Sequence, residues 1–228
     1  MKIHDREGFP NPARIRIVLA AKNLEHRVRF SPVDLIAAEH KQAAFLALNP
    51  SGKVPVLELD DGTLITESTA ITEYLDNLDG DPILTGKTAL EKAMVHMMQR
   101  RAEAELLECV DGYFHYGTPG LGPAMLPYTA PEWEGRTEWA QRQRARALHG
   151  MAYFDAVLQA REFVAGPQFS MADITVFVAL AFAEAAGLAI APEHSALHAW
   201  RAKVAALPAV KNRSGQHFPA EDLKRFGF

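Results

Sequence analysis

The stretch Asn49–Ser68, NPSGKVPVLELDDGTLITES, decides the fold. Its apolar run Val54–Leu59 is typical of a strand, and the turn Asp60–Gly62 predicts a hairpin whose second strand is Thr63–Ile65. Pro55 interrupts this pattern, because proline has no N–H to donate to a sheet and is expected at a strand start, an edge or a bulge. We therefore predict an apolar hairpin that opens at a proline.

Short apolar runs and helical patterns alternate around this hairpin. The proline Pro12 suits a first helical turn, and basic Arg14, Arg16 and Lys22 lie around the apolar positions that follow it. The order of elements predicts a small α/β layer, a mixed sheet with flanking helices. The predicted elements besides the hairpin are strands over Met1–His4 and Arg27–Phe30 and helices over Pro12–Asn23, Glu39–Leu48 and Ser68–Leu78.

The pattern changes after a Gly-, Pro- and Asp-rich linker at Asp79–Thr88. Everything beyond it has helical spacing, apart from the proline- and glycine-rich loop Gly117–Pro131. We predict two domains, residues 1–80 and an all-helical domain over 88–228. The predicted helices of the second domain are Ala89–Tyr116, Glu132–Arg161, Ser170–Gly187 and Ala196–Leu207.

Composition excludes several functional classes. The 228 residues carry a net charge of −4, which argues against a general binder of nucleic acid or anionic membranes. Cys109 is the lone cysteine, so no internal disulfide is possible, and no Cys/His cluster has zinc spacing. The polar N-terminus lacks the apolar core of a signal peptide, and Glu184 interrupts the longest apolar stretch, so we expect a cytoplasmic protein without a membrane span.

Three stretches carry a resemblance to a known family. They are NPSGKVPVLELDDGTLITESTAITEYL at Asn49–Leu75, PARIRIVLAAKNL at Pro12–Leu24, and FSMADITV at Phe169–Val176. In this order and spacing the sequence resembles the cytosolic glutathione transferases, and it is most similar to fungal and bacterial members that lack a first-loop Ser, Tyr or Cys. The resemblance implies a thioredoxin-like glutathione-binding domain followed by an all-α domain that holds the electrophile site.

The resemblance implies that the Val54–Pro55 bond is cis. A cis X-Pro bond is uncommon and is normally kept for a specific turn. It would turn the N–H and C=O of Val54 outward, where the cysteinyl part of glutathione can pair with them like an added strand. From the residues alone, Pro55 could equally be an ordinary turn proline.

The Glu67-Ser68 pair precedes a predicted helix. Ser68 is interpretable as an N-cap, which would stabilise the helix by roughly 1 kcal/mol. By resemblance, Ser68 and the helix N-terminus would bind the γ-glutamyl carboxylate of glutathione, and Glu67 its ammonium group. Lys53 and His40, with Lys41 in reserve, would supply cations for the glycine carboxylate. His40 could equally be a solvated helix residue.

The loop His4–Arg16 contains no Ser, Thr, Tyr or Cys, although the family usually activates the glutathione thiol with such a residue. Three substitutes remain: backbone N–H groups of Asn11–Ala13, the Asn11 amide, or a residue of the helical domain. The candidates of the last kind are Tyr113, His115, Tyr116 and Thr118. His115 is preferred because a neutral imidazole can accept the thiol proton, although it could also be an ordinary helix histidine.

Two further motifs are interpreted as structural. Ser170 and Asp173 approximate a capping box, with Phe169 as a hydrophobic staple. Cys109 lies outside the first loop and is expected to pack as a small apolar residue.

The predicted activity is a glutathione transferase that joins the glutathione thiolate to electrophilic apolar substrates in detoxification. Phe9, Tyr113, Tyr116 and Met125–Leu126 would line the electrophile site. The alternatives are another glutathione-dependent enzyme (isomerase, dehalogenase or peroxidase) and a non-catalytic binding protein. We expect a homodimer with glutathione as co-substrate, no metal or other cofactor, and neither nucleic acid nor membrane as partner.

Overall fold

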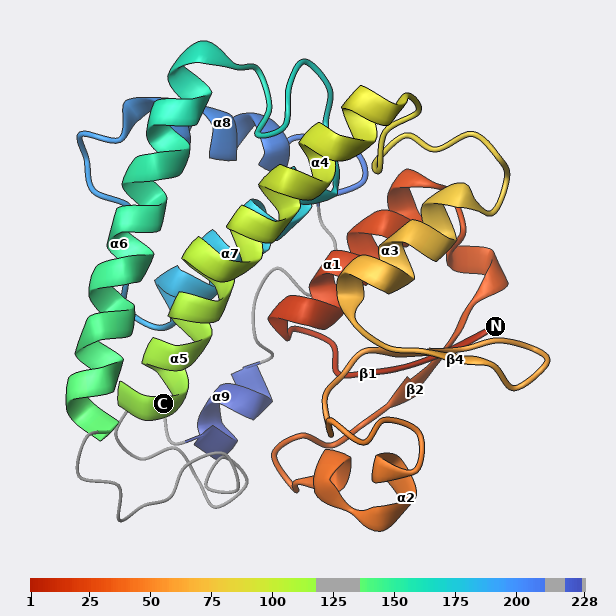
Figure 1. The fold of residues 1–228 in the computed structure, drawn as a ribbon. Coiled ribbons are helices and arrows are strands. Elements are labelled where there is room, and N and C mark those ends of the chain that lie inside the picture. The colour runs from red at the N-terminus through yellow and green to blue at the C-terminus, as the bar shows by residue number, and fades with distance from the viewer. Residues whose placement is uncertain (118–135, 212–219, 227–228) are drawn as a thin grey trace.

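The structure is a computed structural model that describes residues 1–117, 136–211 and 220–226. Figure 1 shows a sheet-bearing half on one side and a helical half on the other, with helix α1 (Pro10–Ala21) lying between them. This arrangement confirms the predicted fold class, a mixed sheet with flanking helices followed by a helical region.

The sheet has the order β2-β1-β3-β4. The inner strand β1 pairs parallel with β2 and antiparallel with β3, where His4 lies opposite Val56. The predicted hairpin is confirmed, since β3 and β4 pair antiparallel with Leu57 opposite Ile65. The strands are β1 (Lys2–Asp5), β2 (Arg29–Pro32), β3 (Val56–Glu58) and β4 (Leu64–Ile65).

The helical elements of the first half follow the predicted order with shifted boundaries. The strand expected from Arg27 starts two positions later, because Arg27 ends a 3-10 turn in which Val28 donates to Glu25. The helix expected over Glu39–Leu48 is broken at Gln42, whose backbone is extended. The elements are α1 (Pro10–Ala21), η1 (Glu25–Arg27), η2 (Glu39–Lys41), α2 (Ala43–Leu46) and α3 (Ser68–Asn77).

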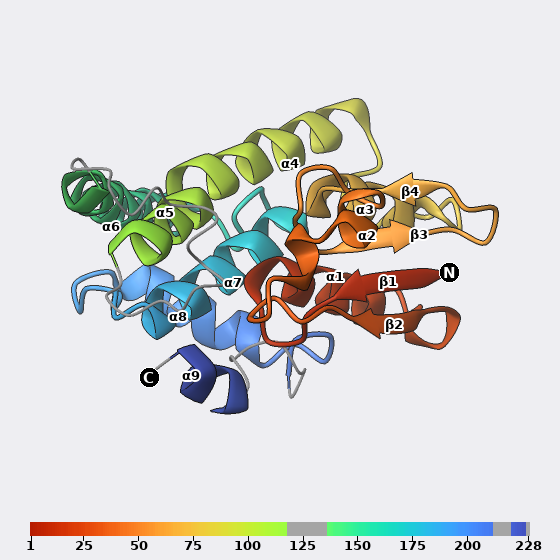
Figure 2. The same cartoon turned by 90° about the horizontal axis from the view of Figure 1, so that it is seen from below.

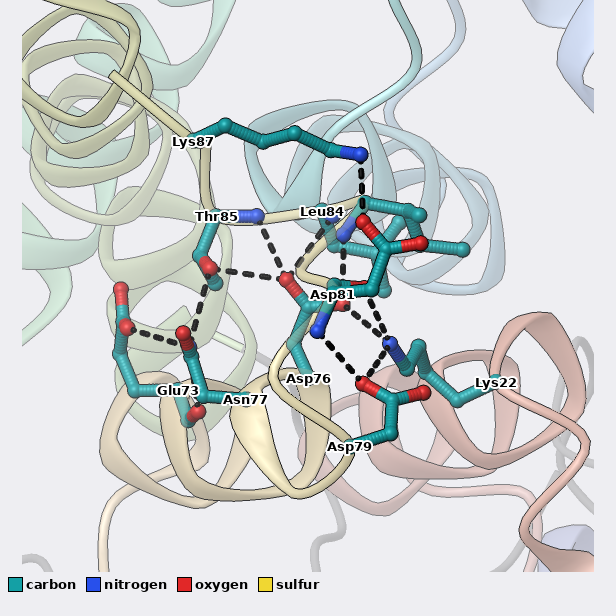
Figure 3. A network of polar contacts seen from close by, with 10 residues as sticks. Lys22, Glu73, Asp76, Asn77, Asp79, Asp81, Leu84, Thr85 and Lys87 are labelled. Atoms are coloured by element: carbon teal, nitrogen blue, oxygen red, sulfur yellow. Dashed lines mark hydrogen bonds and ion pairs between the residues drawn. The ribbon is translucent and has the colours of Figure 1, made fainter.

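The segment between α3 and the next helix, α4 (Ala89–Ala102), is irregular, as expected, but hydrogen bonds hold it firmly (Figure 3). The buried carboxylate of Asp76 accepts from the N–H groups of Ile83, Leu84 and Thr85 at 2.9–3.0 Å. From the end of α1, Lys22 reaches the same segment and lies 2.9 Å from Asp79. One carboxylate thus satisfies the backbone donors that an irregular segment would otherwise leave unpaired.

The helical half differs from the prediction at two places. The helix expected over Ala89–Tyr116 contains a π-helical turn, and a C-terminal helix α9 was not predicted. Positions 132–135 of the predicted Glu132–Arg161 helix lie outside the described residues. The elements are α4 (Ala89–Ala102), η3 (Glu103–Leu107, the π turn), α5 (Glu108–Gly117), α6 (Arg136–Ala160), α7 (Met171–Ala185), α8 (Ser195–Ala205) and α9 (Ala220–Phe226).

Helix α7 is the centre of the core and links the two halves. It packs against both α1 and α4, and in Figure 2 it lies in the middle of the molecule. At its start, Asp173 accepts from the N–H and hydroxyl of Ser170 at 3.0 and 2.8 Å. It also accepts from Val164 N–H and from Trp200 Nε1. The structural interpretation of this motif is therefore confirmed.

Candidate functional site

The first turn of α1 leaves donors of Asn11 open. Pro10 and Pro12 have no N–H, and Ala13 donates to the Phe9 carbonyl at 2.9 Å. This corrects the expectation that N–H groups as far as Ala13 are available. Within the described residues, nothing accepts from the backbone N–H or the side-chain Nδ2 of Asn11, while its Oδ1 accepts from Arg14 at 3.0 Å.

Buried Asn49 shapes the loop that leads to Val54. Its Nδ2 donates to the Lys53 carbonyl at 2.8 Å, and its Oδ1 accepts from the N–H and hydroxyl of Ser51. The Val54–Pro55 bond is cis, as the resemblance implied. Val54 lies outside the β1–β3 ladder, and no described residue is hydrogen-bonded to its N–H or C=O. Its backbone is therefore open to an extended peptide.

Helix α3 presents a second set of open donors. The N-cap is Glu67, with φ 66°, so the interpretation of Ser68 as the N-cap is wrong. Ile71 makes the first helical hydrogen bond, to Glu67. In the part of the chain that the structure describes, the Ser68 hydroxyl and the N–H groups of Ser68, Thr69 and Ala70 have no hydrogen-bond partner. Such a helix start favours a carboxylate.

The residues predicted to supply cations for the glycine carboxylate differ in burial and in charge. His40 is buried, and burial, reinforced by the charge of Lys41, lowers its pKa to about 4. At neutral pH the ring is therefore uncharged, which corrects its predicted role as a cation. Lys41 Nζ donates to the Gly52 carbonyl at 2.8 Å, and its pKa is lowered by burial and by the charge of Lys53. Lys53 is exposed, and no described carboxylate forms an ion pair with it.

His115 on α5 has its Nδ1 2.9 Å from the Asp111 carbonyl and 3.2 Å from the Asp111 carboxylate. Because a carbonyl only accepts, Nδ1 carries the proton and Nε2 of the neutral ring is an acceptor. Burial disfavours the charged ring, but Asp111 outweighs it and raises the pKa of His115. The charge of Lys53 acts on His115, and that of His115 on His40, so α5 and the Val54 loop share one electrostatic environment.

The aromatic residues predicted for the electrophile site lie in two elements. Phe9 precedes α1 and, among the described residues, packs against both the main apolar core and a smaller cluster that includes Phe45 of α2. Tyr113 packs on the core of the helical half, and Tyr116 is half-buried at the end of α5, where its carbonyl accepts from Arg136. Thr118, Met125 and Leu126 lie outside the described residues.

Sequence reasoning missed Arg14 and Glu103. Arg14 was placed with the basic residues around α1, but its side chain is 5% exposed and lies 2.8 Å from the Glu103 carboxylate. Glu103 begins the π turn, which no local sequence pattern indicated. The available signal was that Arg14 directly precedes Ile15 in the apolar pattern of the helix that starts with Pro10-Asn11-Pro12.

A surface cavity of about 600 Å³ lies away from these residues. It is lined by Met1, Lys2, residues 26–29 and residues 58–60, at the N-terminal end of β1, whereas the first loop follows the other end of that strand. Among the described residues, no three His, Cys, Asp or Glu side chains are grouped to hold a metal ion, and no helix has the length and apolarity to cross a bilayer.

Two family models match the chain. Residues 10–78 match the glutathione S-transferase N-terminal domain, and residues 137–203 match the glutathione S-transferase C-terminal domain. Glutathione S-transferase 2 of Saccharomyces cerevisiae is 55% identical over 211 residues, which is 92% of this chain and 88% of the relative.

Solved structures give the same picture. The crystal structure of Gtt2 from Saccharomyces cerevisiae has a TM-score of 0.87 and 55% identity, with 92% of this chain and 98% of that chain covered. A glutathione S-transferase domain-containing protein from Marinobacter aquaeolei VT8 has a TM-score of 0.87 at 46% identity, covering 92% and 100%. A maleylacetoacetate isomerase of Pseudomonas aeruginosa is 39% identical over 48% of this chain and 49% of its own length.

Proposed function

The chain belongs to the glutathione S-transferase family, and from this premise we propose that it joins the glutathione thiolate to an electrophilic carbon of an apolar small molecule. The sulfur forms a thioether with that carbon, and the electrophile either loses a leaving group or takes up a proton. The proposal rests above all on one observation, that two sets of open backbone groups flank the β3–β4 hairpin. The open backbone of Val54 lies on the loop before the hairpin, and the open donors at the start of α3 follow it.

Each part of glutathione has a matching group in this arrangement. The γ-glutamyl carboxylate would accept from the Ser68 hydroxyl and the N–H groups at the start of α3, and Glu67 would accept from the ammonium group. The cysteinyl backbone would pair with Val54 beside Pro55. Lys53 would neutralise the glycine carboxylate, with His40 contributing a neutral hydrogen bond.

Activation of the thiol is assigned to Asn11 and His115. A free thiol has a pKa of about 8.5, so the site must favour the anion. The open N–H and Nδ2 of Asn11 can donate to the sulfur. His115 Nε2 can accept the thiol proton, and the resulting imidazolium is stabilised by Asp111. Phe9, Tyr113 and Tyr116 would line the apolar electrophile site.

The match to the isomerase favours a second candidate, a glutathione-dependent isomerisation at the same site. Titration calorimetry with glutathione and with S-methylglutathione tests binding with and without a thiol. A conjugation assay with an aryl halide, beside an isomerisation assay with maleylacetoacetate, then assigns the chemistry. If neither glutathione nor S-methylglutathione binds, the proposed site is wrong. Binding with no turnover in either assay would favour the non-catalytic alternative.

The assembly and compartment are proposed from separate observations. Helix α4 carries Leu90 and Met97 with 73% and 45% of their surface exposed, and β4 carries Leu64 with 37% exposed. Apolar side chains of this size on one helix favour a two-fold interface with a second copy. The lone, buried Cys109 is consistent with a reducing, cytoplasmic setting. Glutathione is the only co-substrate that the proposed reaction requires.

A further inference from the structure

Arg14 is a buried cation whose guanidinium donates to three side chains. Its Nη1 donates to Asn11 Oδ1 at 3.0 Å, and its Nη2 donates to Thr69 Oγ1 at 3.0 Å and to Glu103 Oε1 at 2.8 Å. Its side chain is 5% exposed, and that of Glu103 is 23% exposed. A guanidinium is planar and rigid, so this fork fixes its plane and its partners together.

A network of side chains from both halves of the molecule holds the Arg14 guanidinium in place. Thr69 Oγ1 and Gln99 Nε2 both donate to Glu103, at 2.7 and 3.0 Å. Gln99 Oε1 in turn accepts from Thr175 on α7 at 3.0 Å. The network therefore joins α1, α3, α4, the π turn and α7. A charge pair that is satisfied in this way specifies one arrangement of its neighbours.

The π turn gives Glu103 its place in this network. At the turn the main chain passes so close to α6 that a Cβ on Gly150 would lie 2.2 Å from the Glu105 carbonyl oxygen. Such turns are frequently found at functional sites. The position of Glu103, and through it that of Arg14, thus depends on the packing of the helical half.

The hydrogen bond from Arg14 fixes the orientation of the Asn11 side-chain amide. The amide of an asparagine has one acceptor and one donor group, and Arg14 occupies the acceptor, Oδ1. The polar group that remains is Nδ2, which has no acceptor among the described residues. Without Arg14 the amide could turn over and present Oδ1, which would repel a thiolate.

We propose that Arg14 is a positioning residue that holds the Asn11 amide as a hydrogen-bond donor to the glutathione thiolate, with Glu103 of the helical half anchoring Arg14. This inference rests on the proposed function. The charge of Glu67 acts on Arg14, and that of Lys53 on the loop acts on His115 of α5. None of these is bonded to Asn11 within the described residues.

The test compares Arg14→Lys, Asn11→Ala and the double variant. Lysine keeps the positive charge but lacks the planar guanidinium that bonds several partners at once. In Arg14→Lys we expect the pKa of bound glutathione, titrated by thiolate absorbance in the ultraviolet, to rise by about one unit. Below that pKa kcat should fall up to about tenfold, with the KM for glutathione within about twofold. If Arg14 acts through Asn11, the double variant should titrate like Asn11→Ala alone.

Two further variants separate positioning from folding. Glu103→Gln keeps the shape of the anchor and should shift the thiol pKa in the same direction; it also carries the test if Arg14→Lys does not fold. Lys22 lies at the other end of α1 and bonds Asp79, so Lys22→Met removes a cation that is distant from Asn11. This variant should lower the melting temperature and leave the thiol pKa unchanged.

The outcomes are distinct. An unchanged thiol pKa in both Arg14→Lys and Glu103→Gln, or shifts of Arg14→Lys and Asn11→Ala that add in the double variant, overturns the positioning role while the transferase proposal stands. Bound glutathione that titrates at its free value in the native protein would instead refute the proposed activation at Asn11 and His115, and the positioning role with it.

Discussion

Thr85 donates both its backbone N–H and its hydroxyl to one carboxylate oxygen of Asp76, at 2.9 and 2.8 Å. The pair connects the end of α3 to the segment that leads into the helical half (Figure 3), and Asp76 is fully buried. The same carboxylate accepts from the two preceding residues of that segment. A single buried side chain thus fixes how the chain leaves the sheet-bearing half.

Replacing Asp76 should therefore destabilise the protein strongly. In Asp76→Ala, the N–H groups of Leu84 and Thr85 lose their acceptor, and we expect a loss of about 3 kcal/mol in the free energy of unfolding. Urea unfolding followed by circular dichroism measures it. The control is Asp81→Asn, which removes an exposed ion pair to Lys87. It should leave the urea midpoint nearly unchanged, and equal midpoints for both variants would contradict the role of Asp76.

His40 should make stability depend on pH. Burial lowers its pKa to about 4, whereas in the unfolded chain the ring has the ordinary histidine pKa of 6.5. The unfolded state therefore binds the proton first as the pH falls, so the stabilisation is complete above pH 6.5 and is lost between about 6.5 and 4. A difference of this size corresponds to about 3 kcal/mol.

The effect of His40 is measured by comparing the free energy of unfolding of the native protein with that of His40→Gln. Asp173, whose pKa is raised to about 6 by burial, acts in the opposite direction, since its contribution is lost as the pH rises from 3.8 to about 6. The two effects partly cancel in the native chain. Urea unfolding of the native protein and of His40→Gln at several pH values isolates the histidine. Parallel stability curves for the two proteins would show that His40 is not the titrating group.

The sequence predicted those features that local patterns encode. The Asp60–Gly62 turn and its flanking apolar residues predicted the hairpin, and proline without an N–H placed Pro55 before β3. The capping pattern at Ser170 and Asp173 predicted the start of α7 to within one residue. Each of these depends on neighbours a few positions away.

The features that sequence reasoning missed depend on distant residues. The π turn at Glu103 accompanies a close approach to Gly150, and the burial of Arg14 requires a carboxylate from the other half. Helix α9 is joined to the first loop by Arg6, which donates to Asp222 at 2.8 Å across 216 positions. No periodicity within one segment carries information about such pairs.

Ser68 should determine the affinity for glutathione. If its open hydroxyl binds the γ-glutamyl carboxylate, Ser68→Ala leaves that carboxylate under-bonded and weakens binding by roughly 1–3 kcal/mol. Titration calorimetry measures the change. The control is Ser51→Ala, which removes a hydroxyl bonded to Asn49 and should change affinity less. Native affinity in Ser68→Ala would remove Ser68 from the site.

The exposed apolar face of α4 should hold two copies together. Sedimentation of the native protein at micromolar concentration should give about twice the chain mass of 25.1 kDa. Leu90→Glu combined with Met97→Glu places charges on that face and should give a monomer. Trp139→Glu alters an exposed apolar residue of α6 and should leave the assembly intact. A native monomer, or a dimer that survives the paired substitution, would contradict this interface.

His115 should be the group that accepts the thiol proton. Its Nδ1 is held by Asp111, so Nε2 is the acceptor, and Asp111 raises the pKa of the ring despite its burial. In His115→Ala the thiolate loses both its proton acceptor and a neighbouring cation, and we expect the bound thiol pKa to rise by about one unit and the conjugation rate at pH 7 to fall about tenfold or more. The falling limb of the native rate at low pH should disappear or move in this variant. His198→Ala is the matched control, because that ring lies on α8, away from the site, with its Nε2 3.2 Å from the Ala191 carbonyl oxygen, and both quantities should stay at native values. If His115→Ala also keeps the native thiol pKa and rate, the ring is structural and the donors of Asn11 must stabilise the thiolate without it.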